Sequence, residues 1–178
     1  ISGDNFGYKR PKGSTDSYYF SQYAHVWGWA TWRRAWKKYD VNMSSWLDEQ
    51  DNVLAKFPHK KERLYWKKLW GATRNNQINT WDYQWLYTCM KYDGLCVMPY
   101  ENQISNLGMG GNATNTNDTD SPVANLTTNT IEFPLIHPKQ LKRNIAGERY
   151  AANLFWMNQI SFIHRVKFKI RKMLRNTL

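Results

Sequence analysis

The stretch Asn79–Trp85, with the sequence NTWDYQW, places one carboxylate, Asp82, between two tryptophans and beside a tyrosine. Asn is a good helix N-cap, and Asp82 would then occupy the third helical position, where a capping box and the helix dipole both favour an acid. The spacing therefore predicts a helix over residues 79–94 that ends at its Asp-Gly pair. The same carboxylate suits a second role, that of a general base fixed by its place in the first helical turn.

Apolar spacing around this stretch predicts three more helices, over residues 31–40, 46–57 and 60–74. In the first of them, Trp32 and Trp36 follow the helical repeat and are expected to face the core. The third has the clearest amphipathic pattern. Together with the helix of the opening stretch, these segments predict a largely helical domain.

The remaining segments indicate short strands and one long loop. Alternating aromatic residues predict short strands within 17–29, and an apolar run predicts a buried strand at 95–100. Residues 105–129 are polar and far longer than a usual connection, so this loop is expected to be functional or disordered. Residues 131–138 should be extended, and 138–174 should be helical with a break.

The composition is that of a basic globular domain with an unusual aromatic content. The 178 residues carry a net charge of +11 and include ten Trp, nine of them between Trp27 and Trp85. Aromatic rings fill cores, but they also stack on the apolar faces of sugars. The charge favours an anionic partner, such as nucleotide phosphates, an acidic membrane surface or nucleic acid.

The basic segment 164–175 interleaves Arg and Lys with apolar side chains. A solvated helix end explains this pattern, and so does an amphipathic contact with an anionic membrane surface. Nucleic acid is not expected as the partner, because the chain has no recognisable RNA-binding motif or zinc finger.

Two further segments carry candidate ligand-binding residues. HVWGW (25–29) sets a glycine between tryptophans, which permits close approach of the backbone to a ligand. The loop SNLGMGG (105–111) is interpreted as a lid whose amides close over a phosphorylated ligand. The candidate substrate-binding residues are His25, Trp27, Gly28, Trp29, Trp81, Asn106, Gly108 and Gly110.

Four segments together resemble a known pattern. They are YYFSQYAHVWGWATWRRAWKKYD (18–40), INTWDYQWLYTC (78–89), SNLGMGGNAT (105–114) and FPLIHP (133–138). Their order and spacing are similar to the C-terminal half of bacterial GT-A-type glycosyltransferases, the nucleotide-diphospho-sugar transferase or HlpA-like family. WGW and WDYQW also bear a fainter likeness to the N-acetylglucosaminyltransferase I family.

The resemblance implies an α/β fold of mainly helices with a few short strands. Residues 1–150 would form the acceptor-side portion of a GT-A domain, and residues 151–178 a basic C-terminal helix. It implies inverting transfer of a sugar from a nucleotide-sugar, expected to be UDP-linked, to a saccharide or lipid-linked acceptor. Asp82 maps to the general base, with Glu101 and Asp40 as reserve candidates.

The resemblance also implies a cofactor and a location. Mn²⁺ or Mg²⁺ is expected, with its ligands mostly in a nucleotide-binding half that would precede residue 1, so no metal ligand is assigned here. Relatives often carry a His where this chain has Asn115. The expected location is the cytoplasm, at the inner face of the membrane. The alternative is a non-catalytic carbohydrate-binding or membrane-surface module.

Overall fold

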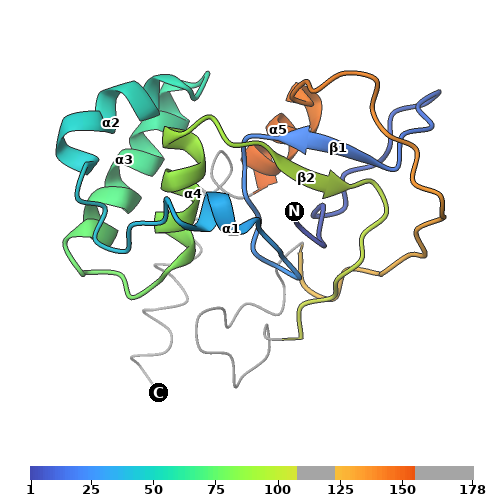
Figure 1. Ribbon diagram of the computed structural model, residues 1–178, viewed down its shortest axis with the longest axis horizontal. Helices are drawn as coiled ribbons and strands as arrows, with labels where there is room; N and C mark the ends of the chain where they lie inside the picture. Colours follow the sequence, from blue (N-terminus) through green and yellow to red (C-terminus); the bar gives the residue numbers. More distant parts are fainter. Residues whose placement is uncertain (108–122, 155–178) are drawn as a thin grey trace, which may run out of the picture.

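A computed structural model describes residues 1–107 and 123–154. The elements, in chain order, are β1 (Tyr18–Ser21), α1 (Arg33–Trp36), α2 (Trp46–Ala55), α3 (Lys60–Arg74), α4 (Asp82–Lys91), β2 (Cys96–Pro99) and α5 (Ile145–Ala152). Helices α2, α3 and α4 pack together at one end of the molecule. The two strands and α5 form the other end, and α1 lies between the two, beside α4 (Figure 1).

Tryptophans form the centre of the helical end. Trp46 of α2 and Trp66 of α3 each lie within 6 Å of Trp70, at ring-centroid distances of 5.7 and 4.9 Å. All three are buried, and the Trp70 ring N–H donates to the backbone oxygen of Tyr83 at 2.9 Å. This hydrogen bond satisfies the polar end of a buried indole and joins α3 to α4.

The helices predicted over 46–57 and 60–74 are confirmed as α2 and α3. The helix predicted over 79–94 is α4, which begins three residues later than expected and ends at Lys91. It ends there because Asp93 has a left-handed backbone, with φ of 53°, which an α-helix cannot continue. The amide of Gly94 then returns to the Cys89 carbonyl at 2.8 Å.

The first predicted helix, 31–40, is largely wrong. Only the four residues of α1 are helical, and Trp32 has an extended backbone at its N-cap position. Trp32 and Trp36 are 47% and 39% exposed, so the expectation that they face the core is also wrong. The physical reason is that the helical repeat places residues on one face but does not say whether another element covers that face.

The sheet joins the two chain segments that flank the helices. β1 pairs antiparallel with β2, from Tyr18 opposite Pro99 to Ser21 opposite Cys96, which confirms the strand predicted at 95–100. Within 17–29 only β1 is a strand. Helix α5 packs on β1.

In the described residues, no helix combines the length and apolar character needed to cross a membrane. The basic segment 164–175, and with it most of the predicted helix over 151–178, lies outside the described residues. The same is true of Asn115.

Candidate functional site

Asp82 is the first residue of α4, and a neighbouring hydroxyl holds its carboxylate. Trp81 occupies the N-cap position and makes no side-chain cap, so the predicted N-cap role of Asn79 is wrong. The Thr80 hydroxyl donates to Asp82 Oδ1, while Gln84 Nε2 donates to the Thr80 carbonyl at 2.6 Å. Asp82 therefore lies at the positive end of the helix dipole, at the first helical position and not at the third as predicted.

Five aromatic side chains form a continuous cluster beside Asp82, which we call the aromatic platform. Its members are Trp29, Trp36, Tyr39, Trp81 and Trp85. Trp29 contacts Trp36, Trp81 and Trp85 at centroid distances of 5.7, 5.0 and 5.9 Å. Trp36 stacks on Tyr39 at 4.5 Å with only 6° between the planes, and it contacts Trp85 at 5.2 Å.

The platform has a buried floor and an open upper side. Trp85 is 5% exposed, whereas Trp36 and Trp81 are 39% and 41% exposed. Such exposure leaves ring surface free for a ligand while the floor keeps the rings in place. The rings come from three places in the chain: the loop before α1, α1 with the turn after it, and the start of α4.

Tyr39 connects the platform to Asp82. Its hydroxyl donates to the Trp81 carbonyl at 3.1 Å. Burial raises the pKa of Tyr39 above its ordinary value, and the charges of Asp82 and Asp40 raise it further. The carboxylate of Asp82 thus lies close enough to the platform for its charge to act on the tyrosine that forms part of it.

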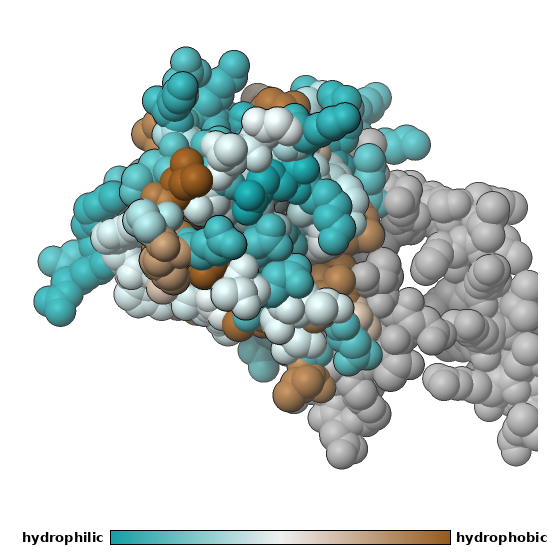
Figure 2. Space-filling model, turned by 90° about the vertical axis from the view of Figure 1, so that its right-hand side faces the viewer, coloured by the Kyte–Doolittle hydropathy of each residue, from teal (hydrophilic) through white to brown (hydrophobic). Residues whose placement is uncertain are grey.

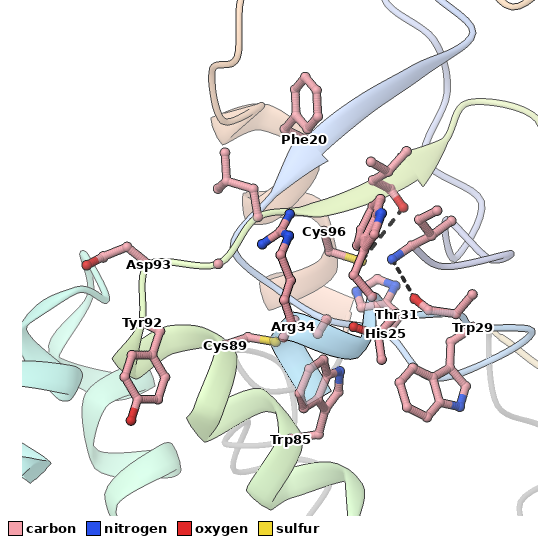
Figure 3. A pocket seen from close by; sticks show the side chains of 18 of the residues that line it. Phe20, His25, Trp29, Thr31, Arg34, Trp85, Cys89, Tyr92, Asp93 and Cys96 are labelled. Carbon is pink, nitrogen blue, oxygen red and sulfur yellow. Dashed lines mark hydrogen bonds between the residues drawn. The ribbon is translucent and has the colours of Figure 1, made fainter. Parts of the chain in front are cut away.

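A cavity of about 450 Å³ adjoins the platform and shares Trp29 and Trp85 with it. Figure 3 shows Arg34 of α1 reaching toward β2 and Cys96 across this space, with Trp85 and Cys89 of α4 below. Because two of its wall residues belong to the platform, the cavity and the platform form one continuous candidate binding region.

His25 lies in the wall of this cavity as half of a buried pair. Its Nδ1 is hydrogen-bonded to Asp4 Oδ1 at 2.7 Å, and Asp4 Oδ2 accepts from the Ser2 hydroxyl at 3.0 Å. The Phe6 ring packs against the imidazole at 4.0 Å. His25 Nε2 is buried and has no hydrogen-bond partner among the described residues.

The other predicted binding residues separate into different environments. Trp27 packs its ring edge-on against Phe6 at 5.2 Å, in a small core cluster away from the platform. Gly28 has φ of +57°, and a Cβ there would lie 2.3 Å from Ile104 Cγ1. The Ile104 side chain therefore approaches the backbone so closely that residue 28 must be a glycine. This packing explains Gly28 without a bound ligand. Asn106 is partly buried, and Gly108 and Gly110 lie outside the described residues.

The two reserve candidates for the base are occupied by local interactions. Glu101 forms an ion pair with Arg10 at 3.3 Å. Asp40 accepts from the backbone amides of Asn42 and Ser44 and from the Ser44 hydroxyl, and this last hydrogen bond is the main reason that its pKa is lowered. Asp82 remains the better placed of the three acids.

Three platform residues, Trp36, Tyr39 and Trp85, were not predicted as site residues. The signal available in the sequence was their type: each is aromatic, and each lies within ten residues of a predicted site residue. What the sequence lacked was the folding of α1 onto α4, which brings Trp36 to Trp85.

The described residues contain no group of side chains suited to bind the expected divalent metal ion. Within residues 1–107 and 123–154, no three His, Cys, Asp or Glu side chains group closely enough to hold a metal ion. Asp82 alone does not fit Mn²⁺ or Mg²⁺, which take several oxygen ligands. The expected metal would therefore need ligands from elsewhere.

No protein-family model matches the chain, and comparisons with curated proteins and with solved structures find no significant match. The function is accordingly inferred from the geometry and chemistry of the site.

Proposed function

We propose that this chain is the acceptor-side portion of an inverting glycosyltransferase, and that Asp82 is its general base. The observation that carries the proposal is the position of Asp82. A carboxylate fixed by Thr80 at a helix N-terminus adjoins a partly exposed platform of aromatic rings. Aromatic rings bind the apolar face of a pyranose, and an adjacent acid can bind or deprotonate a sugar hydroxyl.

The proposed chemistry is a single displacement. The acceptor hydroxyl lies over the platform and gives its proton to the Asp82 carboxylate as its oxygen attacks the anomeric carbon of the donor. The bond from that carbon to the nucleoside diphosphate breaks, and the diphosphate leaves with the bonding electron pair. The donor is proposed to be a nucleotide-sugar, probed first as a UDP-sugar, and no step depends on a metal held by the described residues.

The structure of the acid supports this role in two ways. The carboxylate of Asp82 lies at the positive end of the α4 dipole, which interacts favourably with an acidic side chain. The hydrogen bond from Thr80 fixes one carboxylate oxygen, Oδ1, so the other is left to face the acceptor. Positioning of this kind is a large part of the effect of a catalytic base.

A second candidate function is a carbohydrate-binding module without catalysis. The observation that favours it is that the platform is complete without Asp82, since its five rings contact one another directly. Both functions require saccharide binding, but only the glycosyltransferase turns over a nucleotide-sugar. A measurement of turnover therefore separates them.

The test measures release of nucleoside diphosphate from a panel of nucleotide-sugars by the full-length protein, with saccharide acceptors. Asp82→Asn is expected to lower turnover by about 10²- to 10⁴-fold, the usual contribution of a general base. Asp48→Asn is the matched control, because Asp48 is also an acid in the first turn of a helix but is exposed on α2. It should keep full turnover.

Each outcome decides between the candidates. Near-normal turnover by a folded Asp82→Asn variant, judged by circular dichroism, excludes Asp82 as the base. Saccharide binding by the unmodified protein without turnover on any donor supports the carbohydrate-binding module.

A further inference from the structure

Helix α1 places a group of cations next to the aromatic platform. Its sequence and the two residues after it, RRAWKK, supply Arg33, Arg34, Lys37 and Lys38, and all four are exposed. Residues four apart share one side of a helical turn, so Arg33 and Lys37 lie together, next to Trp36 in the chain. Arg34 and Lys38 form the second pair, and Arg34 also lines the cavity.

These cations are not neutralised within the described part of the chain. The ion pairs found there involve Arg10, His25, Lys56 and Arg143, and none includes a cation of α1. Aromatic faces hold two of them instead: the Arg34 guanidinium lies 5.6 Å from the Trp32 ring centre and the Lys38 ammonium 4.2 Å from that of Tyr92. Four unpaired positive charges in six residues create a local field that attracts anions.

The surface at α1 differs from the face that the sheet end presents. At the sheet end, hydrophilic side chains dominate and apolar ones occur as small separate patches (Figure 2). At α1, exposed indole faces adjoin a row of cations. A ligand that matches both must offer a flat apolar face and negative charge within a few ångströms of it.

We propose that this surface binds an acidic saccharide, a chain of pyranose rings that carry carboxylates. A sugar ring lies on the exposed faces of Trp36 and Trp81, and the cations of α1 bind the carboxylates. The inference rests on the proposed function and deepens it, because it names the class of the acceptor. Charges distributed along a saccharide chain match four cations spread over a helical turn better than one terminal phosphate does.

Nucleic acid fits the surface less well. Its bases stack on rings that are spaced along a groove, whereas these rings contact one another and form a compact platform. The carboxylates of Asp82 and Asp40 also lie close enough to the platform for their charges to act on Tyr39. The same acids accept hydrogen bonds from sugar hydroxyls.

The test is direct binding, measured by quenching of tryptophan fluorescence and by calorimetry, with no donor present. The probes are an oligogalacturonate, its fully methyl-esterified form, polyglutamate and single-stranded DNA. The first carries both pyranose rings and carboxylates, and the second and third each lack one of these. We expect the oligogalacturonate to bind at least about tenfold more tightly than the other probes, with an affinity that falls as salt is added.

Two pairs of variants test the two halves of the surface. Trp36→Ala should weaken binding about tenfold through loss of stacking, whereas Phe133→Ala, which removes an exposed ring elsewhere, should not. The double variant Arg33→Glu/Lys37→Glu should weaken binding of the acid at least about tenfold. Lys67→Glu/Lys68→Glu on α3 makes the same change in net charge and should have little effect.

The outcomes separate this inference from the proposed function. If the acidic and esterified saccharides bind equally well, the cations of α1 do not recognise carboxylates and the inference is wrong. Tighter binding of DNA than of the acidic saccharide, lost in Trp36→Ala, would also overturn it. Failure of every saccharide to bind overturns the inference even if Asp82→Asn abolishes turnover. If the Asp82→Asn variant still binds the acidic saccharide, the inference is supported, whether or not that variant keeps turnover.

Discussion

Replacing Gly28 by Ala is expected to destabilise the fold by about 2–5 kcal/mol. The backbone of Gly28 is left-handed, with φ of +57°, and an alanine there costs about 1–2 kcal/mol. The added Cβ would also lie 2.3 Å from Cγ1 and 2.5 Å from Cδ1 of Ile104. Overlap of this kind forces side-chain or backbone shifts that cost about 1–3 kcal/mol. The two effects act together, which gives the expected range.

Two companion variants separate these effects in urea unfolding followed by circular dichroism. Gly71→Ala lies inside α3, where no other atom comes within 4 Å of the new Cβ, so it should stabilise the protein by about 1 kcal/mol. In the double variant Gly28→Ala/Ile104→Ala, the overlap disappears and the backbone strain stays. Measured relative to Ile104→Ala alone, the added cost of Gly28→Ala should therefore fall to about 1–2 kcal/mol.

The result that refutes this reasoning is a Gly28→Ala variant as stable as the parent protein. In that case the backbone would tolerate a side chain at residue 28. Weakened saccharide binding by such a stable variant would then return Gly28 to the ligand site, as the sequence predicted.

Two further predictions concern titrating groups. The lowered pKa of Asp40 means that its charged form stabilises the fold above its ordinary pKa of 3.8, and that this stabilisation is lost as the pH falls through the lowered value. Asp40→Asn should therefore lower the midpoint of urea unfolding at pH 7 and have a smaller effect near pH 2; an equal effect at both values would contradict the assignment. Burial raises the pKa of Cys89 to about 12 and that of Cys96 in the same direction, so iodoacetamide at pH 8 should alkylate both thiols much more slowly in the native protein than in urea. Equal rates in the two states would show that neither thiol is protected.

The helices could be predicted from sequence where their apolar faces meet other elements. The helix predicted over 60–74 is observed as α3, where Trp66 and Trp70 are buried because α2 and α4 both pack on it. The prediction failed at α1, where Trp36 follows the same spacing but lies at the surface. Periodicity is a local property, whereas burial depends on which elements pack together.

In the candidate site too, the local features were predicted from sequence, whereas contacts between distant segments were not. Asp82 was predicted to lie in the first turn of a helix, and the structure places it there although its cap differs. Gly28 was predicted to approach a ligand closely, and in the structure the side chain that it approaches is that of Ile104. These two residues lie 76 positions apart in the chain, so no local pattern could have joined them.

The distribution of tryptophan supports a binding role for the platform. Trp46, Trp66 and Trp70 are buried among helices α2–α4, where each removes a large apolar area from water. Trp36 and Trp81 keep 39% and 41% of their surface exposed, so they contribute much less to folding than a buried indole would. An exposed apolar patch of this kind usually marks a site of interaction. Because the patch adjoins both the carboxylate of Asp82 and the cations of α1, we expect a ligand that is polar at its edges and apolar on one face, as a charged sugar is.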